Sequence, residues 1–245
     1  MPSSLEPNWQ DDNPVARPDL DRMRRRGVPE VILADRKTTE QALAVVRQFL
    51  ASEGRAILSR VPEALERRLR EEFVGQATLE WYSHCRGAVL RRPDIARANS
   101  GGRVAILTAG TSDIPQAEEA ALVCREMGCQ VFAVYDVGVA GLHRLFEPLD
   151  HVVNEERVDV IIVAAGMDGA LPSVVSGMVP LPVIGLPTSV GYGLGGKGLA
   201  ALLCMLQTCA PGLSVVNIDN GIGAGAVAAL IANGVAAARR EADQP

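Results

Sequence analysis

The sequence predicts an α/β protein, in which a small N-terminal α/β module precedes a three-layer αβα domain built on a doubly wound parallel sheet. The chain is 48% hydrophobic but only 4% aromatic. Its core therefore consists of Ala, Val, Leu and Ile, as in parallel strands flanked by close-packed helices. From residue 103 onward, short β-branched runs alternate with helical patterns, which indicates right-handed crossovers between parallel strands.

The length and the local composition predict where the chain divides. The 245 residues exceed the usual size of one domain and favour two unequal domains. Residues 1–18 hold four prolines among polar residues, so we expect a disordered tail with too little apolar surface to offset the entropy of ordering. The Asn-Ser-Gly-Gly segment at residues 99–102 is a joint. We therefore expect the small module over residues 19–100 and the larger domain over residues 101–245.

The first module begins with a short basic helix at residues 19–26 and a strand at residues 30–33. Thr38 and Gln41 match a capping box, which predicts the start of a helix that ends at Gly54. Its apolar residues recur at the spacing of one helix face. The module is completed by three short strands and one charged helix, at residues 56–58, 79–82, 88–90 and 62–73.

The larger domain is expected to contain five strands, at residues 104–107, 131–135, 158–164, 182–186 and 213–218. Ligands of a doubly wound sheet bind outside the carboxyl ends of its strands. Four of these ends run into Gly-rich or hydroxyl-rich loops, at residues 108–113, 164–172, 186–198 and 217–225. Glycines let the backbone approach a ligand and free amides at helix starts bind phosphate, so an anionic nucleotide fits there. The alternative is that Gly and Ser only form tight turns.

Charge, hydropathy and cysteine usage exclude several classes of function. The 24 Lys and Arg against 29 Asp and Glu give a net charge of −5, which offers no global attraction for nucleic acid or an anionic membrane. No apolar run approaches the roughly 20 residues that span a bilayer, and the N-terminus lacks the pattern of a signal peptide, so we expect a cytoplasmic protein. Five cysteines without a CxxC pair indicate neither a disulfide framework nor a zinc site.

Several segments make the sequence recognisable, at residues 19–32, 108–120, 164–177, 182–193 and 201–225. With these segments the chain resembles the LarB family of nickel-pincer cofactor biosynthesis proteins over nearly its whole length apart from the tail. Its carboxyl-terminal part is similar, more distantly, to PurE-type aminoimidazole ribonucleotide carboxylases and mutases. The resemblance therefore implies that the larger domain is PurE-like.

The resemblance implies carboxylation with CO2 at C5 of the pyridinium ring of nicotinic acid adenine dinucleotide, with hydrolysis of the phosphoanhydride to release AMP. The product is pyridinium-3,5-biscarboxylic acid mononucleotide. Because a pyridinium ring is electrophilic, a nucleophile must first add to C4 and create electron density at C5, and a thiolate both adds and leaves readily. In the LarB pattern this thiol lies in the loop before the last strand, which is Cys209 here.

The resemblance also assigns roles in the other loops. It implies that Ser112 contacts substrate near the reacting ring, and that Asp168 handles the C5 proton where LarB proteins usually have Glu. Helix capping is the structural alternative for Ser112, Asp113 and Asp168. The remaining candidate ligand-binding residues are Lys37, Gly110, Thr111, Asp113, Gly166, Met167, Gly169, Thr188, Ser189, Tyr192, Asn217, Asp219 and Asn220.

Two other functions remain open on the sequence, a PurE-like carboxylase or mutase and a nucleotide-binding module without catalysis. PurE-type enzymes carry a His where this chain has Ala170, which disfavours purine chemistry. The LarB reading adds CO2 or bicarbonate as co-substrate and Mg²⁺ for the anhydride cleavage, with no metal ligands assigned. Apolar helices at residues 198–205 and 224–238 predict packing between subunits, and the PurE-like domain implies an octamer.

Overall fold

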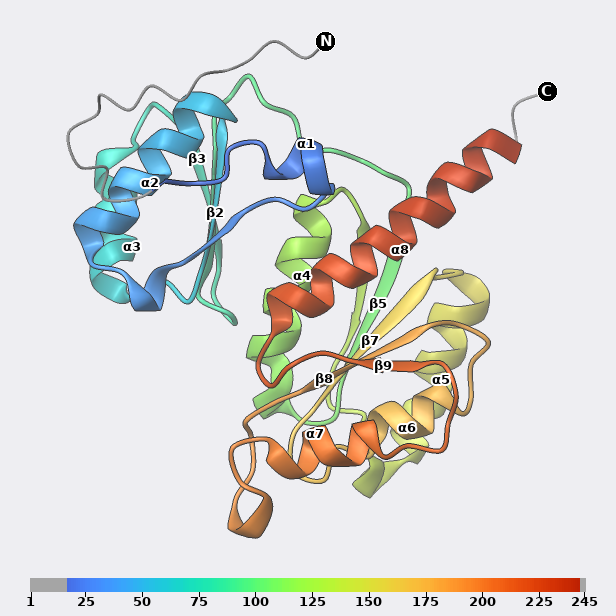
Figure 1. Cartoon of the computed structure of the whole chain (residues 1–245). Coiled ribbons are helices and arrows are strands. Elements are labelled where there is room, and N and C mark those ends of the chain that lie inside the picture. Colours follow the sequence, from blue (N-terminus) through green and yellow to red (C-terminus); the bar gives the residue numbers. More distant parts are fainter. Residues whose placement is uncertain (1–16, 243–245) are drawn as a thin grey trace.

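The computed structural model describes residues 17–242, which form two β-sheets with a helix packed between them (Figure 1). Residues 1–16, most of the predicted tail, lie outside this part of the chain. The α/β class predicted from composition and strand spacing is confirmed.

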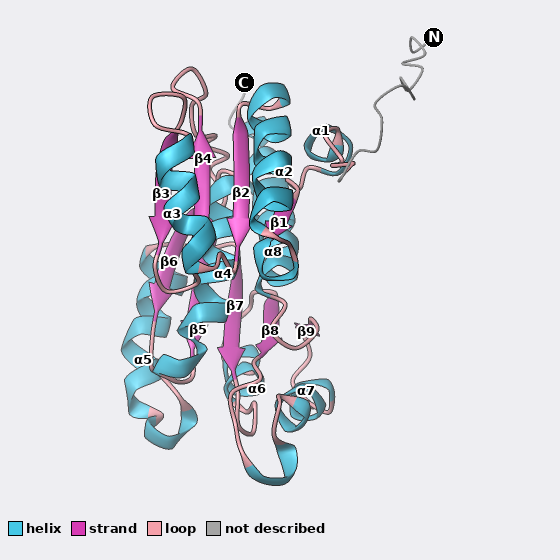
Figure 2. Ribbon diagram, turned by 90° about the vertical axis from the view of Figure 1, so that its left-hand side faces the viewer, coloured by secondary structure: helices cyan, strands magenta, loops and turns pink. Residues whose placement is uncertain are grey.

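The N-terminal sheet has four strands in the order β1-β2-β4-β3. Its strands are β1 (Val31–Leu33), β2 (Arg55–Ser59), β3 (Thr78–Tyr82) and β4 (Gly87–Arg91). Its helices are α1 (Arg22–Arg26), α2 (Thr39–Ser52) and α3 (Glu63–Glu72). Strands β1 and β2 are parallel, and the other two pairs are antiparallel. Helices α2 and α3 cover one face of this sheet, as Figure 2 shows from the side.

Local sequence signals set the first long helix. The Thr38 hydroxyl accepts a hydrogen bond from the Gln41 N–H at 3.2 Å, and the Gln41 side chain accepts one from the Thr38 N–H at 3.0 Å. This is the predicted capping box, which satisfies two amides at the start of α2. The chain after α2 turns through Gly54, whose φ of 68° lies in the left-handed region that glycine adopts without strain.

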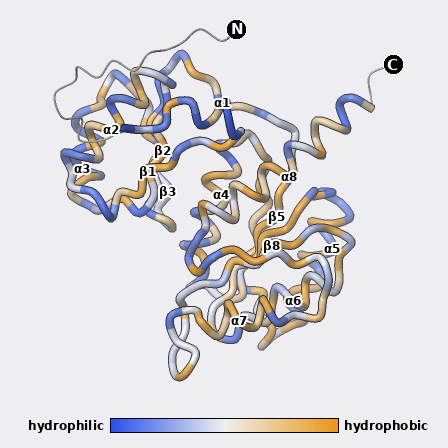
Figure 3. Tube along the Cα trace, viewed as in Figure 1, coloured by the Kyte–Doolittle hydropathy of each residue, from blue (hydrophilic) through white to orange (hydrophobic). Residues whose placement is uncertain are grey.

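The C-terminal sheet has five parallel strands in the order β6-β5-β7-β8-β9. They are β5 (Arg103–Thr108), β6 (Gln130–Val134), β7 (Val160–Ala165), β8 (Val183–Pro187) and β9 (Leu213–Val215). Helices α4 (Ile114–Glu126) and α8 (Gly221–Ala242) cover one face. The other face is covered by α5 (His143–Asp150), α6 (Leu171–Ser176) and α7 (Leu199–Leu206). The predicted three-layer αβα arrangement is confirmed, and β5 and β8 are hydrophobic along their length (Figure 3), as strands covered on both faces must be.

Helix α8 corrects one expectation. By length and composition it is apolar enough to cross a membrane, so the statement that no apolar run approaches that length was wrong. This is weak evidence for a membrane span, because a core helix passes the same test. In the structure α8 lies along α4, where an ideal Cβ on Gly225 would come within 2.5 Å of the Ala120 carbonyl oxygen. Its small residues therefore serve close helix packing.

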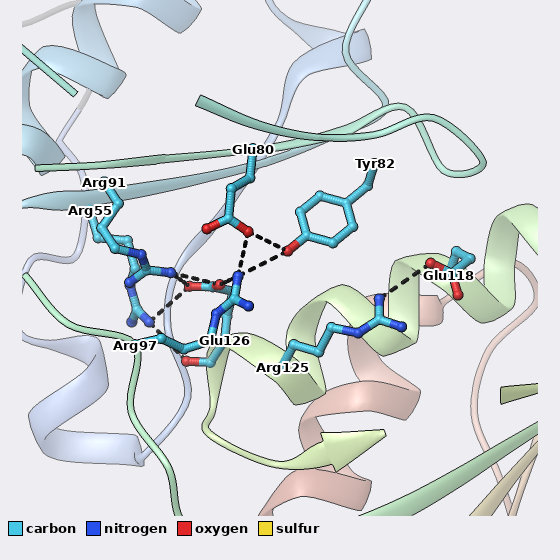
Figure 4. A network of polar contacts seen from close by, with 8 residues as sticks. All are labelled: Arg55, Glu80, Tyr82, Arg91, Arg97, Glu118, Arg125 and Glu126. Carbon is cyan, nitrogen blue, oxygen red and sulfur yellow. Dashed lines mark hydrogen bonds and ion pairs between the residues drawn. The ribbon is translucent and has the colours of Figure 1, made fainter. Parts of the chain in front are cut away.

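Helix α4 also packs against the N-terminal sheet, where Leu122 contacts Ile57 and Val89. At the carboxyl end of α4, the buried carboxylate of Glu126 meets guanidinium groups from two strands of that sheet (Figure 4). Arg91 lies 2.7 Å from it and Arg55 lies 3.1 Å from it. Apolar contact and buried ion pairs together fix the N-terminal sheet on α4.

Candidate active site

The carboxyl ends of β5, β6 and β7 border a cavity of about 570 Å³, called the strand-end cavity below. It includes several of the residues predicted from sequence, namely Gly110, Thr111, Ser112, Asp113, Gly166, Met167 and Asp168. The volume lies within the usual range of small-molecule sites. The loops after β5 and β7 therefore meet where the sheet topology predicted.

Asp113 forms the inner wall of this cavity and is only 3% exposed. Its carboxylate accepts a hydrogen bond from the Gly110 N–H at 2.9 Å and another from the Thr188 hydroxyl at 2.6 Å. Burial raises the pKa of Asp113, although these hydrogen bonds oppose the shift. The carboxyl group thus ties the loop after β5 to the loop after β8, and its side chain does not cap α4.

The turn after β7 carries Asp168 to the cavity. An ideal Cβ on Gly166 would lie 2.3 Å from the Val190 carbonyl oxygen, so this position requires glycine. Met167 follows with φ of 49°, and its N–H donates to the same oxygen at 2.7 Å. Asp168 is exposed, and one carboxylate oxygen accepts a 3.3 Å hydrogen bond from the Ala170 N–H. Within residues 17–242 its other oxygen has no hydrogen-bond partner, which leaves it free for substrate.

The loop after β6 contributes residues that sequence reasoning missed. Asp136 and Arg144 line the cavity, and their side chains form an ion pair of 2.7 Å. Gly138 passes so close to the loop after β5 that a Cβ would lie 2.5 Å from the Ala109 carbonyl oxygen. An acidic residue directly after a predicted strand was the available signal. Arg144, whose guanidinium is held by Asp136, and the exposed Ser112 line the same cavity.

The other predicted ligand-binding residues do not line the strand-end cavity. They are Lys37, Gly169, Thr188, Ser189, Tyr192, Asn217, Asp219 and Asn220. Asp219 adopts a left-handed φ of 56°, and its carboxylate accepts the Ser189 N–H at 2.8 Å. Asn220 accepts the Gly223 N–H at 2.9 Å and so caps α8. Tyr192 and Lys37 are exposed to solvent.

Cys209 lies in the loop between α7 and β9 and is exposed. Helix α7 begins beside Gly169, at the carboxyl edge of the sheet. It runs to the amino-terminal edge, where the Gly212 carbonyl oxygen accepts the N–H of Val183 at the start of β8. Its eight residues span about 12 Å. Within one chain, Cys209 and Asp168 therefore lie at opposite edges of the sheet.

The other four thiols are less available for chemistry. Burial raises the pKa of Cys85 to about 12 and that of Cys129 to about 11. Cys124 is completely buried and its pKa is raised further for the same reason. Burial and the charge of Asp168 raise the pKa of the partly exposed Cys204. All five cysteines are free thiols, as expected.

Metal-binding side chains are sparse. Across the described part of the chain, no three His, Cys, Asp or Glu side chains come close enough to hold an ion together. Mg²⁺ needs fewer protein ligands, since it usually binds one or two carboxylates together with substrate phosphates. The exposed carboxylate of Asp168 fits that requirement.

The sequence matches two protein families, one in each part of the chain. Residues 103–244 match the family described as AIR carboxylase, and residues 10–92 match the LarB/PurE-like N-terminal domain. An uncharacterized protein of Methanocaldococcus jannaschii is 42% identical over 216 residues, which cover 87% of this chain and 82% of that protein.

Similarity also extends to proteins with named activities. The N5-carboxyaminoimidazole ribonucleotide mutase of Methanocaldococcus jannaschii is 33% identical over 56% of this chain and 81% of that protein. The mutase of the same name from Thermotoga maritima is 32% identical over 53% of this chain and 74% of its own length. The crystal structure of Treponema denticola PurE covers 58% of this chain and 98% of its own chain, with 17% identity and a TM-score of 0.41.

Proposed function

Since the chain belongs to the LarB family, with a LarB/PurE-like N-terminal domain before an AIR carboxylase domain, we propose that it carboxylates a pyridinium nucleotide. Its relatives include named mutases, which supports an enzyme related to PurE and LarB proteins. The proposed substrate is nicotinic acid adenine dinucleotide, carboxylated at C5 and then cleaved by water at the phosphoanhydride. The products are pyridinium-3,5-biscarboxylic acid mononucleotide and AMP.

The observation that carries this proposal is the composition of the strand-end cavity. Asp168 offers a carboxylate oxygen free for substrate, and Arg144 offers a cation for a phosphate or a ring carboxylate. Ser112 and Thr111 present exposed hydroxyl groups beside them. A carboxylate base next to anion-binding groups suits removal of a proton from a negatively charged nucleotide.

The proposed reaction uses Cys209 as a nucleophilic catalyst. Its thiolate adds to C4 of the ring, which converts the pyridinium to a neutral dihydropyridine with electron density at C5. C5 then attacks CO2, and Asp168 accepts the proton that C5 still carries. Expulsion of the thiolate from C4 restores the aromatic pyridinium and regenerates Cys209. The exposure of this thiol, against the raised pKa of Cys85 and Cys129, supports its choice.

The separation of Cys209 from Asp168 within one chain supports a site in which the thiol comes from a neighbouring copy. Exposed apolar side chains offer surface for such an assembly, on α7 at Leu199, Leu203 and Leu206 and on α8 at Val227, Leu230 and Val235. Burial of such residues between subunits is the usual source of oligomer stability. The assembly proposed is the octamer implied by the PurE-like domain, with each site completed by two chains.

The co-substrate proposed is CO2, supplied directly or from bicarbonate. Mg²⁺ bound by the substrate phosphates would lower the charge at the phosphoanhydride when it is present. In this reaction the protein needs only to position the dinucleotide, a water molecule and the carboxylate that accepts the C5 proton.

A second candidate is the mutase chemistry of the PurE-type relatives, at 32% and 33% identity. Ala170 argues against it, because it stands where the resemblance to PurE enzymes requires a proton-shuttling His. Mass spectrometry separates the candidates. The parent protein with nicotinic acid adenine dinucleotide, bicarbonate and Mg²⁺ is expected to give the biscarboxylated mononucleotide and AMP. Turnover of N5-carboxyaminoimidazole ribonucleotide in its place would favour the mutase.

Two inactive variants test both the chemistry and the shared site. Cys209→Ser and Asp168→Asn are each expected to bind dinucleotide and to lose most carboxylation. When the two variants are coexpressed and assemble at random, about a quarter of all sites should contain both Cys209 and Asp168, because each site takes one residue from each of two chains. Parent-level activity of Cys209→Ser would exclude covalent catalysis there. Mixed assemblies without activity would contradict a site shared between copies.

A further inference from the structure

A second cavity, called the junction cavity below, lies between the N-terminal sheet and the start of α4. Its volume is about 530 Å³. The turn between β3 and β4 supplies Ser83, His84 and Arg86, and the start of α4 supplies Gln116. Arg60, directly after β2, completes the wall next to Asp219. The junction cavity thus lies between the loops of the N-terminal sheet and helix α4 of the C-terminal part.

The carboxylates of this cavity already have partners. Glu119 is buried and accepts hydrogen bonds from the Ser59 hydroxyl and from Arg60 at 3.0 and 3.2 Å. The Asp219 carboxylate accepts the Ser189 N–H. Neither acidic group therefore needs a cation from a ligand.

Arg86 and His84, in the turn between β3 and β4, differ from these carboxylates because their side chains have no ionic partner within residues 17–242. Both residues are exposed and line the cavity. An unpaired guanidinium beside an imidazole in a concave site is suited to a phosphate group, which a guanidinium binds through two parallel hydrogen bonds.

The cavity also contains an unused acceptor. The side-chain oxygen Oε1 of Gln116 is buried and has no hydrogen-bond partner among residues 17–242. A buried polar atom without a partner costs free energy and calls for a donor from elsewhere. A ribose hydroxyl or a base amino group would supply such a donor.

We propose that the junction cavity binds a nucleoside 5′-monophosphate group, with its phosphate at Arg86 and a sugar or base donor at Gln116. The volume lies within the range of sites for molecules of this size. The inference rests on the proposed function in one respect, because the group in question is the adenylate half of the dinucleotide. The junction cavity holds the half of the substrate that does not react.

The two cavities are connected through the start of α4. Asp113 lines the strand-end cavity, and Pro115 and Gln116 line the junction cavity only two or three residues later. Asp219 adds a second connection, because it lines the junction cavity and its carboxylate accepts the N–H of Ser189 at 2.8 Å, while the next residue, Val190, lines the strand-end cavity. Binding at the junction cavity would therefore help to orient the pyridinium half, as remote binding groups do in other enzymes.

Calorimetric titration of the full chain with AMP, adenosine and inorganic phosphate tests the inference. AMP is expected to bind at least about tenfold more tightly than either fragment. Arg86→Ala and Arg86→Gln are expected to weaken AMP about tenfold or more and to leave adenosine unchanged. Gln116→Leu should weaken AMP and adenosine together. Arg67→Ala, on the exposed face of α3, is the matched control and should change nothing.

Steady-state kinetics separates this inference from the proposed reaction. Arg86→Ala is expected to raise KM for the dinucleotide about tenfold, whereas the control variant Arg67→Ala should leave KM and kcat at the parent level. AMP binding that depends on Arg86, in a protein that carboxylates nothing, would sustain the junction site and reject the proposed function. Equal AMP affinity in the parent and both Arg86 variants, or no AMP binding at all, would overturn the junction site and leave carboxylation standing.

Discussion

The hydroxyl group of Thr188 donates a hydrogen bond of 2.6 Å to the carboxylate of Asp113, although 75 positions separate the two residues. The bond joins the loops that follow β5 and β8, and both side chains are almost completely buried. It therefore makes the shape of the strand-end cavity depend on one carboxyl group whose pKa is raised by burial.

The raised pKa of Asp113 predicts a pH-dependent stability. Below the ordinary value of 3.8, the carboxyl group is protonated in both states and its contribution to the free energy of unfolding is fully present. As the pH rises through the higher pKa of the folded state, that contribution is lost. The parent should therefore lose stability relative to Asp113→Asn over this range, as urea unfolding at a series of pH values would measure. Parallel curves for the two proteins would contradict the shift.

Replacement of the buried carboxylate of Glu126 is expected to lower the stability of the protein strongly. Glu126→Gln leaves Arg55 and Arg91 without their buried counter-charge, which should cost about 3–5 kcal/mol of unfolding free energy. Glu66→Gln is the control, because the Glu66–Arg70 pair is largely exposed along one helix and should cost only about 0.3–0.5 kcal/mol. Similar losses from both variants in urea titrations would show that the buried pair has no special weight.

Two glycines of α8 should respond in opposite directions to alanine. Gly225→Ala places a methyl group 2.5 Å from the Ala120 carbonyl oxygen and forces α4 and α8 apart, at a cost of about 1–3 kcal/mol. Gly234 has nothing within 4 Å of its ideal Cβ, so Gly234→Ala should gain about 0.5–1 kcal/mol from helix propensity. Thermal unfolding gives both values. Destabilisation by Gly234→Ala would indicate an unrecognised contact at that face.

Thiol exposure predicts a labelling order. A soluble disulfide reagent at mildly alkaline pH should react first with Cys209, since it is exposed, whereas Cys85 and Cys129 are buried and have pKa values of about 12 and 11. One fast phase per chain is expected, and it should disappear in Cys209→Ser. Persistence of that phase in the variant would assign it to the partly exposed Cys204.

The fold was largely predictable because each strand can be recognised from its own short run of apolar and β-branched residues. All five strands of the C-terminal sheet occur close to their predicted positions, since β-branched runs such as residues 160–163 are typical of buried parallel strands. Helix α8 is longer than expected, because it begins at Gly221 and continues to Ala242, beyond the apolar stretch at residues 224–238.

The candidate site was predictable only in part. The loop after β6 was not predicted as part of the site, because no single segment of the sequence indicates that β6 lies beside β5 in the sheet. The same holds for Arg60 and Glu119, 59 positions apart, which the sequence presents as ordinary charged residues. Cys209 is exposed, and its distance from Asp168 within one chain follows from the direction of α7 rather than from any residue type.

Helix α4 is shared by two hydrophobic cores, through Leu122 on one side and Ala120 and Val123 on the other. A helix that completes two cores cannot leave one without opening the other. The two halves of the chain should consequently melt in a single cooperative transition, with slow amide exchange along α4 set by global unfolding. Either half expressed alone would expose a surface that in the whole protein never meets water.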